Sequence, residues 1–294
     1  MSSLIIIISN PVSRTFSLKK VHLASDHLKQ SGFETRLLFT ERKGHGAELA
    51  RSAMAENPRA IVAAGGDGTI NEVINGMAGS DIPLGVLPLG TTNVLAKELQ
   101  IPETVEGAVG RVVTGSLAAV SLGRIELSSQ KPSVSRYFCL MAGIGFDARA
   151  VHGVSQGIKR LSGEGAYILS GIRSFIRYRP EELIFTIDGK EFKGFAAIIG
   201  KASRYGGRYR VNPDADIRDP HFYLCILTGQ SRADLLHFAS GIIMGNHLKN
   251  PDVLYMKASH IEIQGSSDVQ IDGDYFGITP ATISVAPSAL RLIC

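Results

Sequence analysis

The sequence predicts a protein of two domains, an α/β domain with a mainly parallel sheet followed by a β-rich domain. Up to about Leu122, apolar β-type runs alternate with segments of helical apolar spacing. Alternation of this kind implies right-handed crossovers and a parallel sheet covered by helices on both faces. Beyond that point, runs with period-2 alternation predominate, as in antiparallel strands. A chain of 294 residues is long enough to bury two such cores.

The first domain is expected to span residues 1–122. Its elements follow the hydrophobic periodicity, and the breaks between them fall at polar, glycine and proline residues. In chain order we expect a strand at Leu4–Ile8, a helix at Ser17–Gln30, a strand at Glu34–Phe39, a helix at His45–Glu56, strands at Ala60–Ala64 and Pro83–Leu87, and a helix from Val94.

The second domain is expected to span residues 123–283. Asp188-Gly189 lies between two of its apolar runs and is typical of a hairpin turn. Helical stretches at Ala150–Tyr178 and Arg232–Met244 interrupt the strands. The expected strands are Val120–Leu127, Arg136–Ala142, Leu183–Asp188, Phe192–Gly200, Phe222–Thr228, His260–Gln264 and Val269–Asp272.

A glycine cluster that holds one acid follows the strand at Ala60–Ala64. It reads Gly65-Gly66-Asp67-Gly68-Thr69 and runs directly into a segment of helical spacing. Glycines allow close approach to a ligand, and the amides and dipole of a helix N-terminus favour an anion, so this loop suits a phosphate chain. Asp67 would repel phosphate unless it held a metal, oriented a hydroxyl or accepted a proton. The alternative is a tight turn in which Asp67 caps the helix.

A second loop of the same kind follows the next strand. Pro88-Leu89-Gly90-Thr91-Thr92-Asn93 separates that strand from the helix that begins at Val94. Open α/β sheets bind ligands outside the carboxyl ends of their strands, so both loops are expected at one edge of the sheet. Together they favour phosphoryl transfer.

These motifs resemble the diacylglycerol kinase catalytic-domain family, which includes soluble bacterial lipid kinases and the sphingosine and ceramide kinases. GGDGT alone is shared with NAD kinases, whereas the ordered set over nearly the whole chain is specific. The resemblance implies a Rossmann-like first domain and a sandwich-like lipid-binding second domain, with residues 284–294 returning to the first. The other matching segments are Asn10-Pro11, Thr40–His45, Ala142–Ala148, Tyr205–Gly207, Asn212–Ala215 and Asp272–Asp274.

The resemblance also implies ATP and magnesium, because phosphoryl transfer needs a phosphate cradle and a divalent metal. Turn, cap and solvated-face roles are the ordinary alternatives for these residue types. The residues implied to bind the nucleotide are Asn10, Thr40, Gly65, Gly66, Asp67, Gly68, Thr69, Asn93, Lys159, Arg160 and Asp274.

Two carboxylates compete for the role of catalytic base. The family places the first acid of an Asp-Gly-acid triplet in that role, and Asp272 matches it, although Asp272-Gly273 is also a typical hairpin turn. The third position is more often Glu than Asp274. We favour Asp272 as the base and Asp67 as the metal or hydroxyl partner, with the reverse assignment left open.

Three further acids are implied by the resemblance. Asp147 marks the start of the lipid pocket, with helix capping as the alternative. Asp216 and Asp219 match acids that hold a structural magnesium in bacterial members, although Pro220 replaces the usual glycine.

Composition limits the partners. A formal charge of +4 without a basic tract gives no nucleic-acid signature. Three widely spaced cysteines support neither a disulfide framework nor a zinc site, which fits a reduced cytoplasm. No apolar run is long enough for a membrane span, so we expect a peripheral enzyme that meets its lipid at the inner membrane face. A homodimer is an open alternative to a monomer.

The leading hypothesis is therefore an ATP- and magnesium-dependent kinase of a diacylglycerol-like or other amphipathic lipid alcohol. NAD kinase is the second hypothesis, because it shares GGDGT. The third is a catalytically silent nucleotide or lipid sensor, suggested by departures from the family pattern at Lys201, Arg208 and Pro220.

Overall fold

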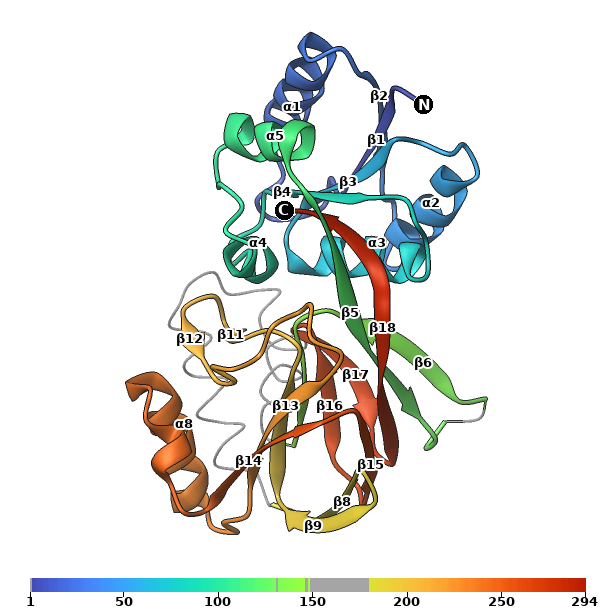
Figure 1. Ribbon diagram of the computed structural model, residues 1–294. Coiled ribbons are helices and arrows are strands. Elements are labelled where there is room, and N and C mark those ends of the chain that lie inside the picture. Colours follow the sequence, from blue (N-terminus) through green and yellow to red (C-terminus); the bar gives the residue numbers. More distant parts are fainter. Residues whose placement is uncertain (1, 131, 146–147, 149–179) are drawn as a thin grey trace. The chain divides into compact units, whose positions relative to one another are not determined.

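The chain forms two compact units (Figure 1). The computed structural model describes residues 2–130, 132–145, 148 and 180–294. Unit 1 comprises the residues up to Leu122, residues 217–220 and residues 286–294, and unit 2 comprises residues 123–216 and 221–285. The helix expected at Ala150–Tyr178 lies outside the described residues.

Unit 1 is built on four parallel strands in the order β2-β1-β3-β4. Ile5 to Ile8 of β1 are at most 1% exposed, as expected for a strand covered on both faces. The predicted parallel sheet is thereby confirmed. The strands are β1 Leu4–Ser9, β2 Glu34–Phe39, β3 Ala60–Gly65 and β4 Leu84–Pro88.

Five helices in the described part of unit 1 cover this sheet. Ser17 caps α1 by accepting a hydrogen bond from the backbone amide of Lys20. In space α1 packs against α5, and α2 packs closely against α3, where a Cβ on Gly76 would lie 2.5 Å from the carbonyl oxygen of Ala47. The helices are α1 Leu18–Gln30, α2 His45–Met54, α3 Asp67–Met77, α4 Val94–Glu98 and α5 Val105–Thr114, the last of which the periodicity did not predict.

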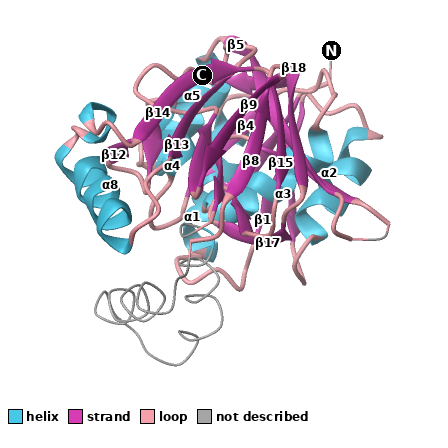
Figure 2. Ribbon diagram, turned by 90° about the horizontal axis from the view of Figure 1, so that it is seen from below, coloured by secondary structure: helices cyan, strands magenta, loops and turns pink. Residues whose placement is uncertain are grey.

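Unit 2 is β-rich, as predicted, and its strands are antiparallel (Figure 2). One sheet has the order β14-β13-β10-β7-β16-β17, and β8 pairs with β9 and β15 in the other. Fully buried Phe138, Phe185 and Phe222 belong to the core cluster of this unit. Two strands, β5 Leu117–Leu127 and β18 Ala281–Ile293, have residues in both units. The strands within unit 2 are β6 Val134–Phe138, β7 Met141–Ile144, β8 Leu183–Ile187, β9 Lys190–Gly194, β10 Ala196–Gly200, β13 Phe222–Leu227, β14 Val253–Ala258, β15 His260–Gln264, β16 Asp268–Ile271 and β17 Asp274–Ile278.

Two predicted strands are in fact divided. The segment Arg136–Ala142 breaks between β6 and β7, because the amides of Cys139 and Leu140 donate to the side chain of Asp272 instead of continuing a ladder. The segment Phe192–Gly200 breaks at Phe195, where the chain leaves the β8–β9 hairpin and enters the other sheet as β10. Both segments are mostly apolar, so hydrophobic patterning alone does not show either break.

A helix and a small hairpin complete unit 2. Helix α8, Arg232–Met244, has the predicted bounds. The hairpin of β11 Arg204–Tyr205 and β12 Tyr209–Arg210 packs against it through β12, and both figures show the two together. No helix in the described ranges is both long and apolar enough to cross a membrane. All three cysteines are free, in agreement with the sequence.

Candidate active site

Four of the predicted nucleotide-binding segments lie at one edge of the unit 1 sheet. The strands β1 to β4 are parallel and in step, so their carboxyl ends meet there. Asn10 follows β1, and buried Thr40 follows β2, with its amide donating to the carbonyl of Ser9 at 2.9 Å. The glycine loop follows β3, and the loop to Asn93 follows β4. The structure thus brings together Asn10, Thr40, Gly65–Thr69 and Asn93.

The two glycine loops are in backbone contact. A Cβ on Gly90 would overlap the Cα of Gly66, and a Cβ on Gly66 would lie 3.2 Å from the Cα of Gly90. The amide of Leu89 donates to the carbonyl of Gly65 at 3.0 Å. Glycine is therefore required at position 90, whereas a Cβ at position 66 would be a tight contact between the loops.

Asn93 holds the second loop in shape. Its backbone is left-handed at φ 48°, and its Oδ1 accepts from the amide of Gly90 while its Nδ2 donates to the Gly90 carbonyl, both at 2.9 Å. Asn tolerates this backbone better than most residues. Asn93 therefore positions Gly90, independently of its predicted contact with a nucleotide.

Asp67 is the first residue of α3 and lies close to the start of α4. The amide of Leu95 is 3.4 Å from Asp67 Oδ1. Burial raises the pKa of Asp67, and the neighbouring amides of Leu95 and Val94 offset only part of that effect. A desolvated carboxylate of this kind binds protons and cations more strongly than an exposed one.

Glu72 is a site residue that the sequence analysis missed. From α3 its carboxylate accepts from the amide of Gly44 at 2.8 Å and from the amide of Gly46 at 3.0 Å. A Cβ on Gly46 would lie 2.8 Å from Glu72 Oε2, so glycine is needed at that position. Glu72 thus ties the helix of the glycine loop to the segment that follows Thr40. Its only signal in the sequence is an acid within the helical segment that follows the glycine loop.

Asp272 occupies the turn between β16 and β17, in the hairpin conformation that Asp-Gly favours, with φ 48° followed by φ 86° at Gly273. Its Oδ2 accepts from the amide of Cys139 at 2.8 Å. Its Oδ1 accepts from the amides of Leu140 and Met141, both at 2.9 Å. These bonds occupy most of the acceptor capacity of the carboxylate and favour its ionised form.

Asp274 is ion-paired. Both terminal nitrogens of Arg136 lie 3.3 Å from Asp274 Oδ2, and the two side chains are 18% and 34% exposed, respectively. Asp274, the last acid of the Asp272–Asp274 triplet, is therefore paired with a cationic side chain of unit 2.

The structure does not test the other predicted site residues. Asp147, Lys159 and Arg160 lie outside the described residues. Asp216 is exposed and belongs to unit 2, whereas Asp219 belongs to unit 1. Among the residues that the structure describes, no group of three or more His, Cys, Asp or Glu side chains could hold a metal ion. The structural magnesium at Asp216 and Asp219 stays a prediction.

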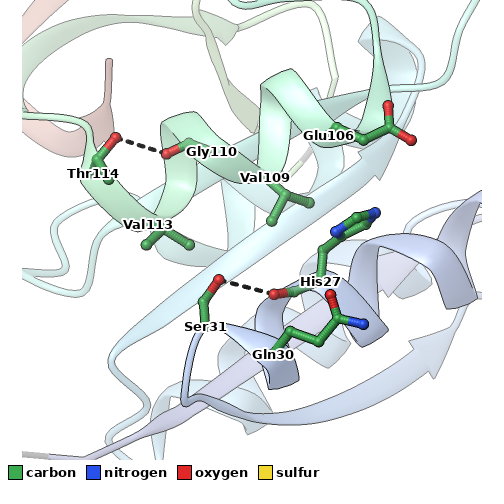
Figure 3. Close-up of a pocket in the computed structure, with 8 residues that line it drawn as sticks. All are labelled: His27, Gln30, Ser31, Glu106, Val109, Gly110, Val113 and Thr114. Atoms are coloured by element: carbon green, nitrogen blue, oxygen red, sulfur yellow. Dashed lines mark hydrogen bonds between the residues drawn. The ribbon is translucent and has the colours of Figure 1, made fainter.

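A recess of about 340 Å³ between α1 and α5 contains none of the predicted residues (Figure 3). The hydroxyl of Ser31 donates to the carbonyl of His27, and that of Thr114 donates to the carbonyl of Gly110, both at 2.9 Å. These two hydroxyls are engaged by carbonyl groups at helix ends. The residues that line it are His27, Gln30, Ser31, Glu106, Val109, Gly110, Val113 and Thr114.

Known proteins share both the sequence pattern and the fold. Residues 4–125 match the diacylglycerol kinase catalytic domain, and residues 141–294 match the YegS C-terminal NAD kinase beta sandwich-like domain. Diacylglycerol kinases of Staphylococcus aureus strains RF122 / ET3-1 and MRSA252 are each 33% identical over 282 residues, which cover 94% of this chain and 87% of theirs.

Solved structures from Bacillus anthracis str. Sterne have the same fold. A candidate diacylglycerol kinase superposes with a TM-score of 0.76 at 21% identity, over 99% of this chain and 96% of that one. A further diacylglycerol kinase structure gives 0.70 at 18% identity, again over 99% and 96%.

The fold and the paired glycine loops define a phosphotransferase with an α/β domain and a β-sandwich domain. Within that class, the chain belongs to the diacylglycerol kinase catalytic-domain family and is a lipid kinase. A kinase of this family acts on a nucleotide and usually uses a divalent metal.

Proposed function

We propose that this protein transfers the γ-phosphoryl group of ATP, with Mg²⁺, to a hydroxyl of a diacylglycerol-like or other amphipathic lipid alcohol. The observation that carries the proposal is the meeting of four strand ends at the two contacting glycine loops, with Asp67 between two helix N-termini.

The glycine loop suits the phosphates of the nucleotide. The first amides of α3 point out of its N-terminus, which favours an anion. Gly68 is exposed, and a Cβ there would meet nothing within 4 Å, so its backbone is open to a ligand. Gly65 packs against the side chain of Thr69, which fixes the curve of the loop.

The donor set fits magnesium. Mg²⁺ prefers oxygen ligands and is held in kinases by one or two carboxylates together with substrate phosphates. Asp67 is the carboxylate of unit 1 that lies within the glycine loop, and it would hold the ion there. When bound, the metal neutralises charge that develops on the transferred group.

The surroundings of the two acids bear on which one takes the proton. The three amide hydrogen bonds to Asp272 stabilise its charged form and weaken it as a base. Burial has the opposite effect on Asp67, because a raised pKa makes a carboxylate a better proton acceptor near neutral pH. The contacts of Asp272 favour a positioning role for it. A carboxylate that holds Mg²⁺ is a weak base, so Asp67 accepts the proton only if another group holds the ion. Asp272 as the base is the assignment we predicted from the sequence, and mutagenesis is its test.

The deciding experiment supplies Mg²⁺ and radiolabelled ATP with dioctanoylglycerol, sphingosine, ceramide or NAD in parallel. We expect label in a lipid product. Label in NADP alone would identify an NAD kinase, and nucleotide binding without any turnover would identify a sensor. A matched Asp67→Asn variant shows whether the label depends on the glycine loop.

A further inference from the structure

The outer face of α8 carries large apolar side chains. Leu236, Ile243 and Met244 are 54%, 65% and 72% exposed. The opposite face is also apolar, and Leu235 and Phe238 pack into a cluster with strands of unit 2. A surface helix ordinarily shows polar residues to water, so a helix that is apolar on both faces indicates a surface that something else covers.

A basic hairpin lies beside this helix. In the β11–β12 hairpin, Arg208 and Arg210 are exposed, and neither forms an ion pair with any residue that the structure describes. Tyr205 of the same hairpin packs on the cluster that holds Leu235 and Phe238, so the helix and the hairpin are fixed to one support. Exposed apolar side chains and exposed arginines therefore lie on two elements that pack on one support.

The ends of α8 hold it firmly in place. At the start, Ser231 and Asp234 form a capping box, and Asp234 accepts from the amide of Ser231 at 2.8 Å. At the end, Gly245 adopts the left-handed conformation at φ 72°. Asp234 is the one acid within α8, and it is engaged at the cap, whereas Arg232 adds positive charge at the start of the helix.

We propose that the exposed face of α8 and the β11–β12 hairpin form a docking surface for an anionic lipid bilayer. Aliphatic side chains on an interfacial helix enter the boundary between headgroups and acyl chains, and adjacent arginines attract anionic headgroups. The charge of the hairpin selects this occupant over a neutral apolar partner. The inference rests on the proposed function, since a kinase of an amphipathic lipid meets its substrate at such a surface.

The test is co-sedimentation of the full-length protein with vesicles, without nucleotide. Phosphatidylcholine vesicles containing about a third phosphatidylglycerol should bind the protein, and vesicles of phosphatidylcholine alone should bind it much less. Added salt should weaken binding, because the Debye length falls to about 3 Å at 1 M.

Two variants examine the two halves of the surface. Leu236→Asn combined with Ile243→Asn should weaken vesicle binding about tenfold through lost apolar burial. Arg208→Gln combined with Arg210→Gln should weaken it by a similar factor and reduce its salt dependence. The matched controls are Leu117→Asn, at a leucine that is 55% exposed in unit 1, and Lys19→Gln with Lys20→Gln on α1.

Each outcome either supports or overturns the proposed docking surface. Selective loss of binding in the α8 and hairpin variants, with unchanged melting temperature, supports the surface. Equal loss in the controls, or no vesicle binding by the wild type, overturns it. If light scattering shows a wild-type dimer that the α8 variant dissociates, the face binds a second copy and the proposal is wrong. Phosphorylation of soluble dioctanoylglycerol, measured separately, tests the proposed function independently of vesicle binding.

Discussion

At the scale of single residues, the burial of the Asp67 carboxyl affects both its chemistry and the stability of the folded protein. Burial raises the pKa of its carboxyl, so the folded protein holds the proton more tightly than the unfolded chain does. Stability therefore falls as the pH rises from the ordinary pKa of an aspartate through the raised value of the folded state.

We accordingly expect Asp67→Asn to lower kcat by about 10²-fold or more without lowering the melting temperature at pH 7. Asn keeps an oxygen that can accept from the amide of Leu95 and removes the buried charge. Any gain in stability should disappear below about pH 4, where the wild-type carboxyl is protonated in both states. Thermal melts from pH 3 to pH 8 measure this, and a variant that melts well below the wild type at pH 7 would contradict the account.

Asp272 should behave in the opposite way. Asp272→Asn places an amide NH₂ or a single oxygen against three backbone N–H donors, so at least one buried donor loses its partner. We expect a loss of about 1–3 kcal/mol in the free energy of unfolding.

Denaturant unfolding measures that loss, and steady-state kinetics at a temperature where the variant is folded measure its rate. A rate within about tenfold of the wild type would assign a positioning role to Asp272. A fall of about 10²-fold or more with unchanged stability and unchanged KM for ATP would restore Asp272 as the base, as the sequence first indicated.

At the scale of elements, the two glycine loops need their glycines for different reasons. Gly90→Ala forces a Cβ into the backbone of Gly66, so the loops must separate, and we expect both the melting temperature and ATP binding to fall. Gly68→Ala is its matched control, because a Cβ there has open space. That variant should melt within about 2 °C of the wild type and raise KM for ATP. Equal melting temperatures for the two variants would show that the loop contact is unimportant.

The contact between α3 and the start of α2 depends on Glu72. Glu72→Ala leaves the amides of Gly44 and Gly46 without their acceptor, and charged acceptors of this kind contribute about 1.5–3 kcal/mol each. We expect a rise in KM for ATP that exceeds the fall in kcat, with partial recovery in Glu72→Gln, which keeps one oxygen.

The control for Glu72 is Glu56→Ala, which removes the carboxylate of an exposed ion pair with Arg36. Such pairs contribute about 0–1 kcal/mol, so this variant should be nearly neutral. If Glu72→Ala reduced stability but left both kinetic constants unchanged, Glu72 would be a structural residue only.

Local patterns predict elements better than they predict contacts between elements. Apolar runs were sufficient for β1, β3 and β4, because these strands are almost wholly buried. Glu72 and Asp272 bond to backbone amides, which carry no side-chain signature in the sequence. The contact of Gly66 with Gly90 joins loops that are adjacent only through strand order.

At the scale of the whole molecule, the chain does not divide at one boundary. Residues 217–220 belong to unit 1 although their neighbours belong to unit 2, and the amide of Ser121 donates to the carbonyl of Ile217 at 2.9 Å. At the end of the chain, Leu292 of β18 pairs with Leu84 of β4. Four residues are too few to show a composition or periodicity of their own. Sequence patterns therefore could not show that residues 217–220 belong to unit 1.

The central claim is that the contacting glycine loops of unit 1 phosphorylate a lipid alcohol. The most direct measurement is transfer of label from γ-labelled ATP, with Mg²⁺, to dioctanoylglycerol by the wild type and by Asp67→Asn. The account predicts labelled phospholipid product from the wild type and a loss of about 10²-fold or more in the variant. Label in NADP instead, or equal lipid phosphorylation by both proteins, would contradict it.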